Sequence, residues 1–121
     1  MPMPAPRKYR NKPVYVTPAG ETVDGEHAGP KTKMFDSQSE HRRWCELVAL
    51  RDAGRISDLR RQVRFDLHAL GGAKLTIYRA DFTYIEAGRR IVEDRKGKRT
   101  KAYLLRKKWM KAEHGIEIRE T

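Results

Sequence analysis

Two aspartates and a lysine between positions 77 and 96 have the residue types and spacing of a site for metal-dependent phosphodiester hydrolysis. Asp81 lies in a run where apolar and polar residues alternate. This alternation is typical of a β-strand and places Asp81 on the face opposite the aromatic residues. Asp94 and Lys96 are two positions apart, so on a second strand they point to the same side. Carboxylate oxygens bind hard cations such as Mg²⁺, so this stretch predicts a metal-dependent site.

The connection Glu86-Ala87-Gly88-Arg89 between the two expected strands decides which acids face each other. A loop of two or four residues sets Asp81 opposite Asp94, with Cβ atoms roughly 5 Å apart. A three-residue loop with Gly88 in the left-handed conformation would instead set Glu93 opposite Asp81. In both registers two carboxylates face each other, which is unfavourable without a cation between them. The competing interpretation is a solvated, exposed face, and it stays open because 36% of the residues are charged.

The chain of 121 residues carries 27 Lys and Arg against 16 Asp and Glu, a formal net charge of +11. In so short a chain this excess predicts a polyanionic partner, because each neutralised phosphate releases counterions and adds affinity. Nucleic acid is the partner that fits best. An anionic membrane surface would require a basic amphipathic helix with a wide apolar face, which the sequence lacks.

The sequence contains no targeting signal and no cysteine framework. It has no apolar run long enough to span a membrane, and residues 1–12 lack the apolar core of a signal peptide. We therefore expect a soluble, cytoplasmic protein with no membrane partner. Cys45 is the only cysteine, which excludes an internal disulfide and a cysteine-rich zinc site. The four histidines lack the spacing of a metal site: His27, His41, His68 and His114.

The length suits one domain with a modest core around one sheet and two helices. We expect a flexible, basic arm over residues 1–12 and a single domain over residues 13–121. Alternation and turn signals predict a three-stranded antiparallel meander from Val63 to Lys96, within the order α-β-β-β-α-β. The other expected segments are a short strand at 14–17, a polar loop at 24–33, a helix opening within 35–40 and ending near 53, a connection at 56–61, the first strand of the meander at 62–68, a helix at 101–114 and a strand at 116–119.

Glu40, near the start of the first expected helix, has two interpretations. The sequence Ser37-x-x-Glu40 forms a capping box, in which the glutamate side chain accepts a hydrogen bond from the backbone N–H of the cap. On local pattern alone this is the stronger interpretation. The other places Glu40 on the first helical turn, facing the sheet and completing a metal site.

The second expected helix begins after Thr100, a suitable N-cap, and stops at Gly115. One side carries Tyr103 and Met110, and the remaining surface is strongly basic. Such charges usually lie on a solvated face that has no specific partner. Because this helix follows the paired acids, a face that contacts phosphate becomes a stronger interpretation. The predicted DNA-binding cations are Lys98, Arg99, Lys101, Arg106, Lys107, Lys108 and Lys111.

These residues and this element order resemble the PD-(D/E)XK nuclease superfamily, and more closely small phage-encoded members related to Holliday junction resolvases. The resemblance covers roughly Val14 to Ile118. It implies a restriction-endonuclease-like α/β fold of the mixed α+β kind, with a central mixed sheet of four strands flanked by two helices. The matching segments are Phe35-Asp36-Ser37 with Glu40, Ala80-Asp81-Phe82-x-Tyr84, Val92-Glu93-Asp94-x-Lys96-Gly97, and Thr100 with Tyr103.

Carried over position by position, the resemblance assigns four catalytic residues. It implies that Asp81 and Asp94 hold one or two Mg²⁺ ions, with Mn²⁺ as a substitute. It implies that Lys96 orients or deprotonates the attacking water. The helical glutamate of junction resolvases falls on Glu40, as a further metal ligand.

Two positions depart from the superfamily pattern. Ala80 stands where the motif has the proline that gives it its name. Glu93 precedes Asp94, which leaves open which acid binds metal, although the x-Lys spacing and the strand parity select Asp94.

The resemblance implies a metal-dependent endodeoxyribonuclease that hydrolyses DNA phosphodiester bonds, with selectivity for four-way or otherwise branched DNA. Two symmetric nicks in a junction require a homodimer. A phage- or prophage-encoded protein acting in the cytoplasm of a bacterial host is also implied. The alternative from another class is a non-catalytic basic nucleic-acid-binding module, in which the two aspartates moderate a basic sheet.

Overall fold

The computed structural model of the chain describes residues 13–27, 29, 31–95 and 99–121. By their internal contacts the residues divide into two compact units, one ending at Cys45 and one spanning Glu46–Thr121. The basic arm over residues 1–12 lies outside the described residues, and the single domain over residues 13–121 stays a prediction.

The first unit holds a small antiparallel sheet. The strand β1 pairs with β2 on one side and with β3 on the other. Val14, Val16 and Phe35 are buried together, with Trp44 packed against them. The short strand expected near residue 14 is confirmed, whereas the expected polar loop is more structured than predicted. The elements are β1 (Val14–Val16), β2 (Thr22–Val23), the 3₁₀ helix η1 (Gly25–His27) and β3 (Lys33–Phe35).

The helix α1 (Gln38–Asp52) begins in the first unit and ends in the second. The Ser37 hydroxyl accepts a hydrogen bond from the backbone N–H of Glu40 at 3.1 Å, and the Glu40 carboxylate accepts one from the backbone N–H of Asp36 at 3.2 Å. The expected capping box therefore closes the start of the helix, although the glutamate reaches one residue beyond the cap. The helix stops before Gly54, whose φ of 76° lies in the left-handed region that favours glycine.

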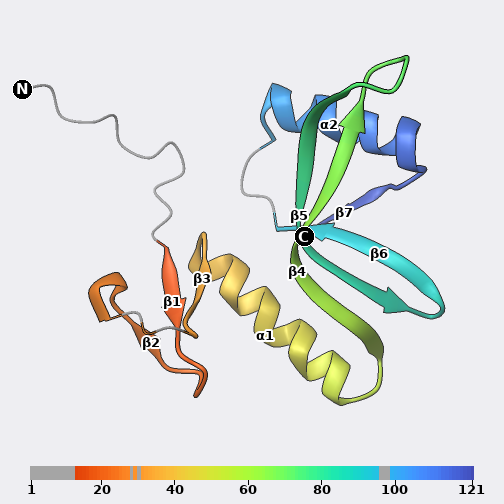
Figure 1. Cartoon of the computed structure of the whole chain (residues 1–121). Coiled ribbons are helices and arrows are strands. Elements are labelled where there is room, and N and C mark those ends of the chain that lie inside the picture. Colours follow the sequence, from red (N-terminus) through yellow and green to blue (C-terminus); the bar gives the residue numbers. More distant parts are fainter. Residues whose placement is uncertain (1–12, 28, 30, 96–98) are drawn as a thin grey trace, which may run out of the picture. The chain divides into compact units, whose positions relative to one another are not determined.

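The second unit contains a four-stranded mixed sheet in the order β4-β5-β6-β7, and Figure 1 shows its strands and α2. The first three strands are antiparallel neighbours, while β7 runs parallel to β6. A parallel pair needs a long crossover, which α2 supplies. The order α1-β4-β5-β6-α2-β7 confirms the predicted mixed fold with two helices. The elements are β4 (Ile56–His68), β5 (Lys74–Glu86), β6 (Arg89–Asp94), α2 (Lys101–His114) and β7 (Ile118–Glu120).

The strand β4 begins six residues before the expected position, so the predicted connection at 56–61 is wrong. Ile56 pairs with Glu86 and His68 with Lys74, so the pairing with β5 extends from one end of β4 to the other, with interruptions. The register shifts between Ser57 and Arg60, which breaks the alternation that sequence patterns depend on. At the other end of the unit, the N–H of Ile116 bonds to a helical carbonyl at 3.3 Å. The last strand therefore starts two residues later than predicted.

The turn between β5 and β6 selects one of the two expected registers. Ala87 and Gly88 have φ values of 50° and 77°, and a two-residue hairpin loop of type I′ requires positive φ at both positions. Phe82 pairs with Glu93 and Thr83 with Val92. The next position outward therefore places Asp81 beside Asp94. The register predicted for a two-residue loop is confirmed, and the three-residue alternative is wrong.

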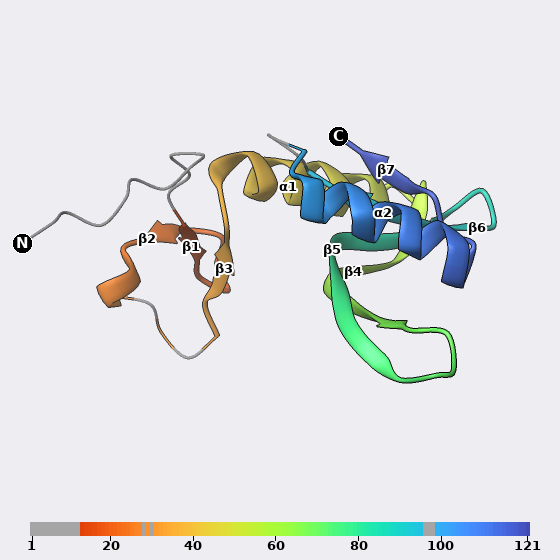
Figure 2. The same ribbon diagram turned by 90° about the horizontal axis from the view of Figure 1, so that it is seen from above.

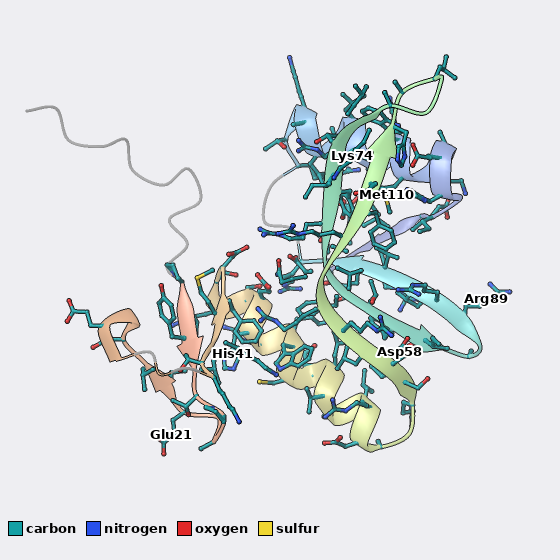
Figure 3. All side chains as sticks on the ribbon, viewed as in Figure 1. Glu21, His41, Asp58, Lys74, Arg89 and Met110 are labelled. Carbon is teal, nitrogen blue, oxygen red and sulfur yellow. The ribbon has the colours of Figure 1, made fainter. Side chains whose placement is uncertain are left out.

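The core of the second unit lies between α2 and the sheet (Figures 1 and 2). Met110 of α2 is fully buried and points toward the β4–β5 hairpin in Figure 3. Neither α-helix of the described residues has a stretch that is long and apolar enough to span a bilayer. The buried cluster consists of Leu67, Tyr78, Ala80, Val92, Tyr103, Met110 and Ile118.

We predict that Met110→Ala lowers the free energy of unfolding by about 3 kcal/mol, because it leaves a cavity in the core. The matched control is Leu105→Ala on the same helix, because the Leu105 side chain is 61% exposed. This control should change stability by less than about 0.5 kcal/mol. Urea denaturation of both variants tests the packing of α2, and equal losses would contradict it.

Candidate active site

Asp81 and Asp94 are joined across β5 and β6 by two hydrogen bonds between side chain and backbone. The Asp81 N–H donates to Oδ1 of Asp94 at 2.9 Å, and the Arg95 N–H donates to Oδ2 of Asp81 at 2.9 Å. Each carboxylate therefore accepts a hydrogen bond from the backbone of the opposite strand. Asp94 is fully buried and Asp81 half-buried. Backbone N–H donors stabilise the charged form of a carboxylate, which offsets part of the repulsion between the two acids.

Glu93 is held apart from this pair by a separate network. Its two oxygens accept hydrogen bonds from the Tyr84 hydroxyl at 2.6 Å and the Thr121 hydroxyl at 3.1 Å. Arg119 donates to the Tyr84 oxygen at 3.2 Å. Burial raises the pKa of Tyr84, and its hydrogen bond to Glu93 raises that pKa further. Of the two neighbouring acids on β6, Asp94 is therefore the one that contacts the backbone at Asp81.

Tyr103 brings α2 into the electrostatic surroundings of the two aspartates. The Thr100 hydroxyl accepts a hydrogen bond from the Tyr103 N–H at 3.1 Å, which caps the helix as expected. The Tyr103 side chain is buried. Burial raises the pKa of Tyr103 strongly, and the negative charges of Glu120, Asp94 and Asp81 add to the rise. The first turn of α2 thus lies near both acids.

Glu40 belongs to the first unit, whereas Asp81 and Asp94 belong to the second. Glu40 is 3% exposed. In the capping box its backbone N–H donates one hydrogen bond and one of its carboxylate oxygens accepts another. Its role as a metal ligand stays a prediction. Lys96 and Lys98 lie outside the described residues, so their roles stay predictions as well.

The remaining predicted DNA-binding cations separate into two groups. Arg99 and Lys107 form ion pairs with Glu120, at 3.2 Å for Arg99, and Lys111 pairs with Glu117 at 3.2 Å. The other group has no carboxylate of the described chain within ion-pair distance, and these cations stay available for an external anion. This second group is Lys101 and Lys108, which are exposed, and Arg106, which is half-buried.

The donor atoms around the aspartate pair suit Mg²⁺, which prefers oxygen ligands. Among the described residues, no group of three or more His, Cys, Asp or Glu side chains surrounds a common point where a metal ion would fit. Mg²⁺ commonly takes only one or two protein carboxylates and keeps waters and substrate phosphates as its other ligands. Two carboxylates held by backbone bonds fit this requirement.

A family model described as a protein of unknown function, DUF1064, matches residues 26–120. The chain belongs to the DUF1064 family. No curated protein and no solved structure matches it. The DUF1064 match includes Glu40, both aspartates and α2, and it covers every strand of the mixed sheet.

Two polar residues next to Asp81 were missed in the sequence. Gln62 has a φ of 55°, although it lies within β4. Thr83 is 1% exposed, and its hydroxyl has no hydrogen-bond partner among the described residues. The alternation around Thr83 marks it only as a strand residue. No sequence signal indicates a left-handed glutamine within a strand.

We predict that the stability of the protein falls as pH rises above about 10, the ordinary pKa of tyrosine. Burial raises the native pKa of Tyr103, so the folded chain keeps a proton that the unfolded chain releases. The free energy of unfolding then decreases with increasing pH. Tyr103→Phe should show a shallower decrease between pH 10 and 11 in urea denaturation. Equal slopes in the two proteins would contradict the strongly raised pKa of Tyr103.

Proposed function

We propose that this DUF1064 protein is a metal-dependent endodeoxyribonuclease that hydrolyses DNA phosphodiester bonds. The observation that carries the proposal is the pair of carboxylates on adjacent strands, each held by the backbone of the other strand. Such an arrangement keeps two carboxylates close together, and a divalent cation bound between them would stabilise both charges. The proposal is supported by the sheet order and by the net charge of +11 of the whole chain, within which the aspartate pair is locally acidic.

In this proposal Asp81 and Asp94 hold Mg²⁺, and Mn²⁺ can replace it. A bound divalent cation would lower the pKa of a coordinated water and neutralise charge on the scissile phosphate. The backbone N–H groups of Asp81 and Arg95 fix the rotamers of the two carboxylates before substrate binds. Because the two carboxylates are already fixed, binding of the metal and substrate would cost less conformational entropy.

The exposed cations of α2 supply the attraction for DNA in this proposal. Lys101 and Lys108 are one heptad apart, so they lie on the same side of the helix. Tyr103, in the first turn of α2, lies close enough to Asp81 and Asp94 for their charges to raise its pKa. The N-terminus of a helix also attracts phosphate. A DNA backbone following α2 would therefore pass close to the two acids.

The substrate class follows only from the resemblance to junction-resolving nucleases. Branched DNA, such as a four-way junction, is the proposed substrate, and a homodimer would supply two sites for paired nicks. Glu40 and Lys96 would complete the site as a further metal ligand and as the residue that orients the attacking water.

A non-catalytic nucleic-acid-binding module is the second candidate, and one observation favours it. The backbone hydrogen bonds of Asp81 and Asp94 also serve as a structural link between strands, and the described residues show no third ligand beside them. This candidate predicts salt-dependent DNA binding with no effect of Mg²⁺ on the DNA.

We predict that Asp81→Asn and Asp94→Asn each lower the cleavage rate by more than about 100-fold. Mutating a residue that only supports a metal ligand typically lowers activity about 10–100-fold, and removing the ligand itself should lower it more. DNA affinity should stay equal or increase, since each change removes a negative charge from a phosphate site. The measurement uses labelled four-way junction and matched linear duplex, with Mg²⁺, Mn²⁺ or EDTA.

The matched control for these two variants is Asp66→Asn. Asp66 is an exposed acid of β4 that pairs with Lys74 at 3.4 Å, and its change alters charge equally. This control should cleave as the wild type does. Cleavage that persists in EDTA would overturn the metal-dependent mechanism. No cleavage by the wild type together with tight binding would overturn the nuclease and leave the binding module. Equal cleavage of junction and duplex would remove only the junction selectivity.

We predict that Lys108→Ala weakens DNA binding and reduces the slope of log affinity against log salt by about 0.9, the value for one phosphate contact. The control is Lys74→Ala, which removes the same charge from a lysine that already pairs with Asp66. Lys74→Ala should leave the slope nearly unchanged. Equal changes in both variants would mean that net charge, and not the surface of α2, determines binding.

A further inference from the structure

The backbone of Gln62 has a conformation that is unusual within a β-strand. Its φ of 55° lies in the left-handed region, where the Cβ of an ordinary residue crowds the following carbonyl oxygen. Its neighbours are paired in register, Arg61 with Phe82 and Val63 with Ala80. The ladder has no pair at Gln62 itself, but the two flanking pairs place Gln62 beside Asp81 of β5.

Two other residues of the described chain with positive φ, glycines aside, have ordinary explanations. Asp58, with a φ of 49°, lies where the register between Ser57 and Arg60 shifts, so it absorbs an extra residue in a bulge. Ala87 forms the two-residue turn described above. At Gln62 the register is the same on both sides, and the ladder is interrupted at this residue. Strained backbone of this kind clusters at active sites and ligand clamps, where it helps to position functional groups.

Gln62 lies beside the aspartate pair. Gln62 on β4, Asp81 on β5 and Asp94 on β6 occupy neighbouring places across three adjacent strands. Gln62 is half-buried, as Asp81 is. A carboxamide carries two N–H donors and no charge, so it can bind an anionic oxygen without competing for the cation that two carboxylates attract.

We propose that Gln62 contacts the DNA phosphate at the aspartate site, with its side-chain amide donating a hydrogen bond to a phosphate oxygen. This inference rests on the proposed function for the location of the phosphate. The left-handed backbone of Gln62 orients the amide toward that oxygen. Gln62 is then the neutral donor of the site, beside the two acids that hold the metal.

The experiment compares Gln62→Glu, Gln62→Gly and the control Asp58→Gly. Asp58 lies on the part of β4 remote from the β4–β5 turn, where Lys74 marks the opposite end of the hairpin (Figure 3). DNA affinity is measured by fluorescence anisotropy in EDTA and in Ca²⁺, cleavage in Mg²⁺ over a range of DNA concentrations, and Tm by thermal melting.

Both glycine variants should raise Tm by roughly 2–5 °C, because glycine adopts positive φ without strain. Gln62→Gly should nevertheless bind DNA about tenfold more weakly, since it loses a hydrogen bond to a charged group. Gln62→Glu should weaken binding still more, because it sets a negative charge against the phosphate. The loss should appear mainly in KM, and Asp58→Gly should bind and cleave at least as well as the wild type.

Separate results overturn the inference and the proposed function. If the wild type cleaves DNA and Gln62→Glu binds and cleaves equally well, the phosphate contact is wrong and the nuclease stands. If binding in the Gln62 variants falls only together with Tm, the role of Gln62 is structural and the contact is also wrong. If the wild type binds without cleaving and Gln62→Glu still weakens binding without lowering Tm, the contact stands and the nuclease fails.

Discussion

The two hydrogen bonds that link Asp81 and Asp94 to each other's strands are the interaction on which the rest of the site depends. They exist only in the register that the turn at Ala87 and Gly88 selects, because a shift of one residue would turn Glu93 toward Asp81. The parallel strand β7 then supports Asp94 from its other side, since the Thr121 N–H donates to the Asp94 carbonyl at 3.0 Å. Turn, register and last strand thus act together to place one pair of carboxylates.

The electrostatics around this pair connect the fold to the proposed chemistry. Backbone N–H groups stabilise part of the charge of the two acids. The ion pair of Lys107 with Glu120 joins α2 to β7, and Arg99, just before the helix, pairs with the same glutamate. Lys101 and Lys108 remain exposed on that helix. The second unit therefore combines an acidic centre with a basic helix that lies near it. That combination suits a site that must bind both a cation and a polyanion.

The features of the fold that depend on neighbouring residues were predictable from the sequence, and those that depend on distant residues were not. Thr100 and Gly115 define the ends of α2 because each satisfies backbone groups within one turn. The strand parity selected Asp94 over Glu93, and the structure places Asp94 beside Asp81. The start of β4 was missed because its pairing with β5 is long-range and a bulge at Asp58 interrupts the alternation. Gln62 had no sequence signal, because left-handed backbone at a glutamine is a consequence of tertiary structure.

Divalent metal binding at Asp81 and Asp94 tests the central claim most directly, and NMR spectroscopy with Mn²⁺ measures it without any substrate. Paramagnetic Mn²⁺ broadens the amide signals of residues close to it. The account predicts that substoichiometric Mn²⁺ broadens the signals of Asp81 and Arg95 first, and that Asp94→Asn removes this effect. Broadening at the aspartate pair no stronger than at the exposed Asp66, or broadening that persists in Asp94→Asn, would contradict the claim that the pair is a metal site.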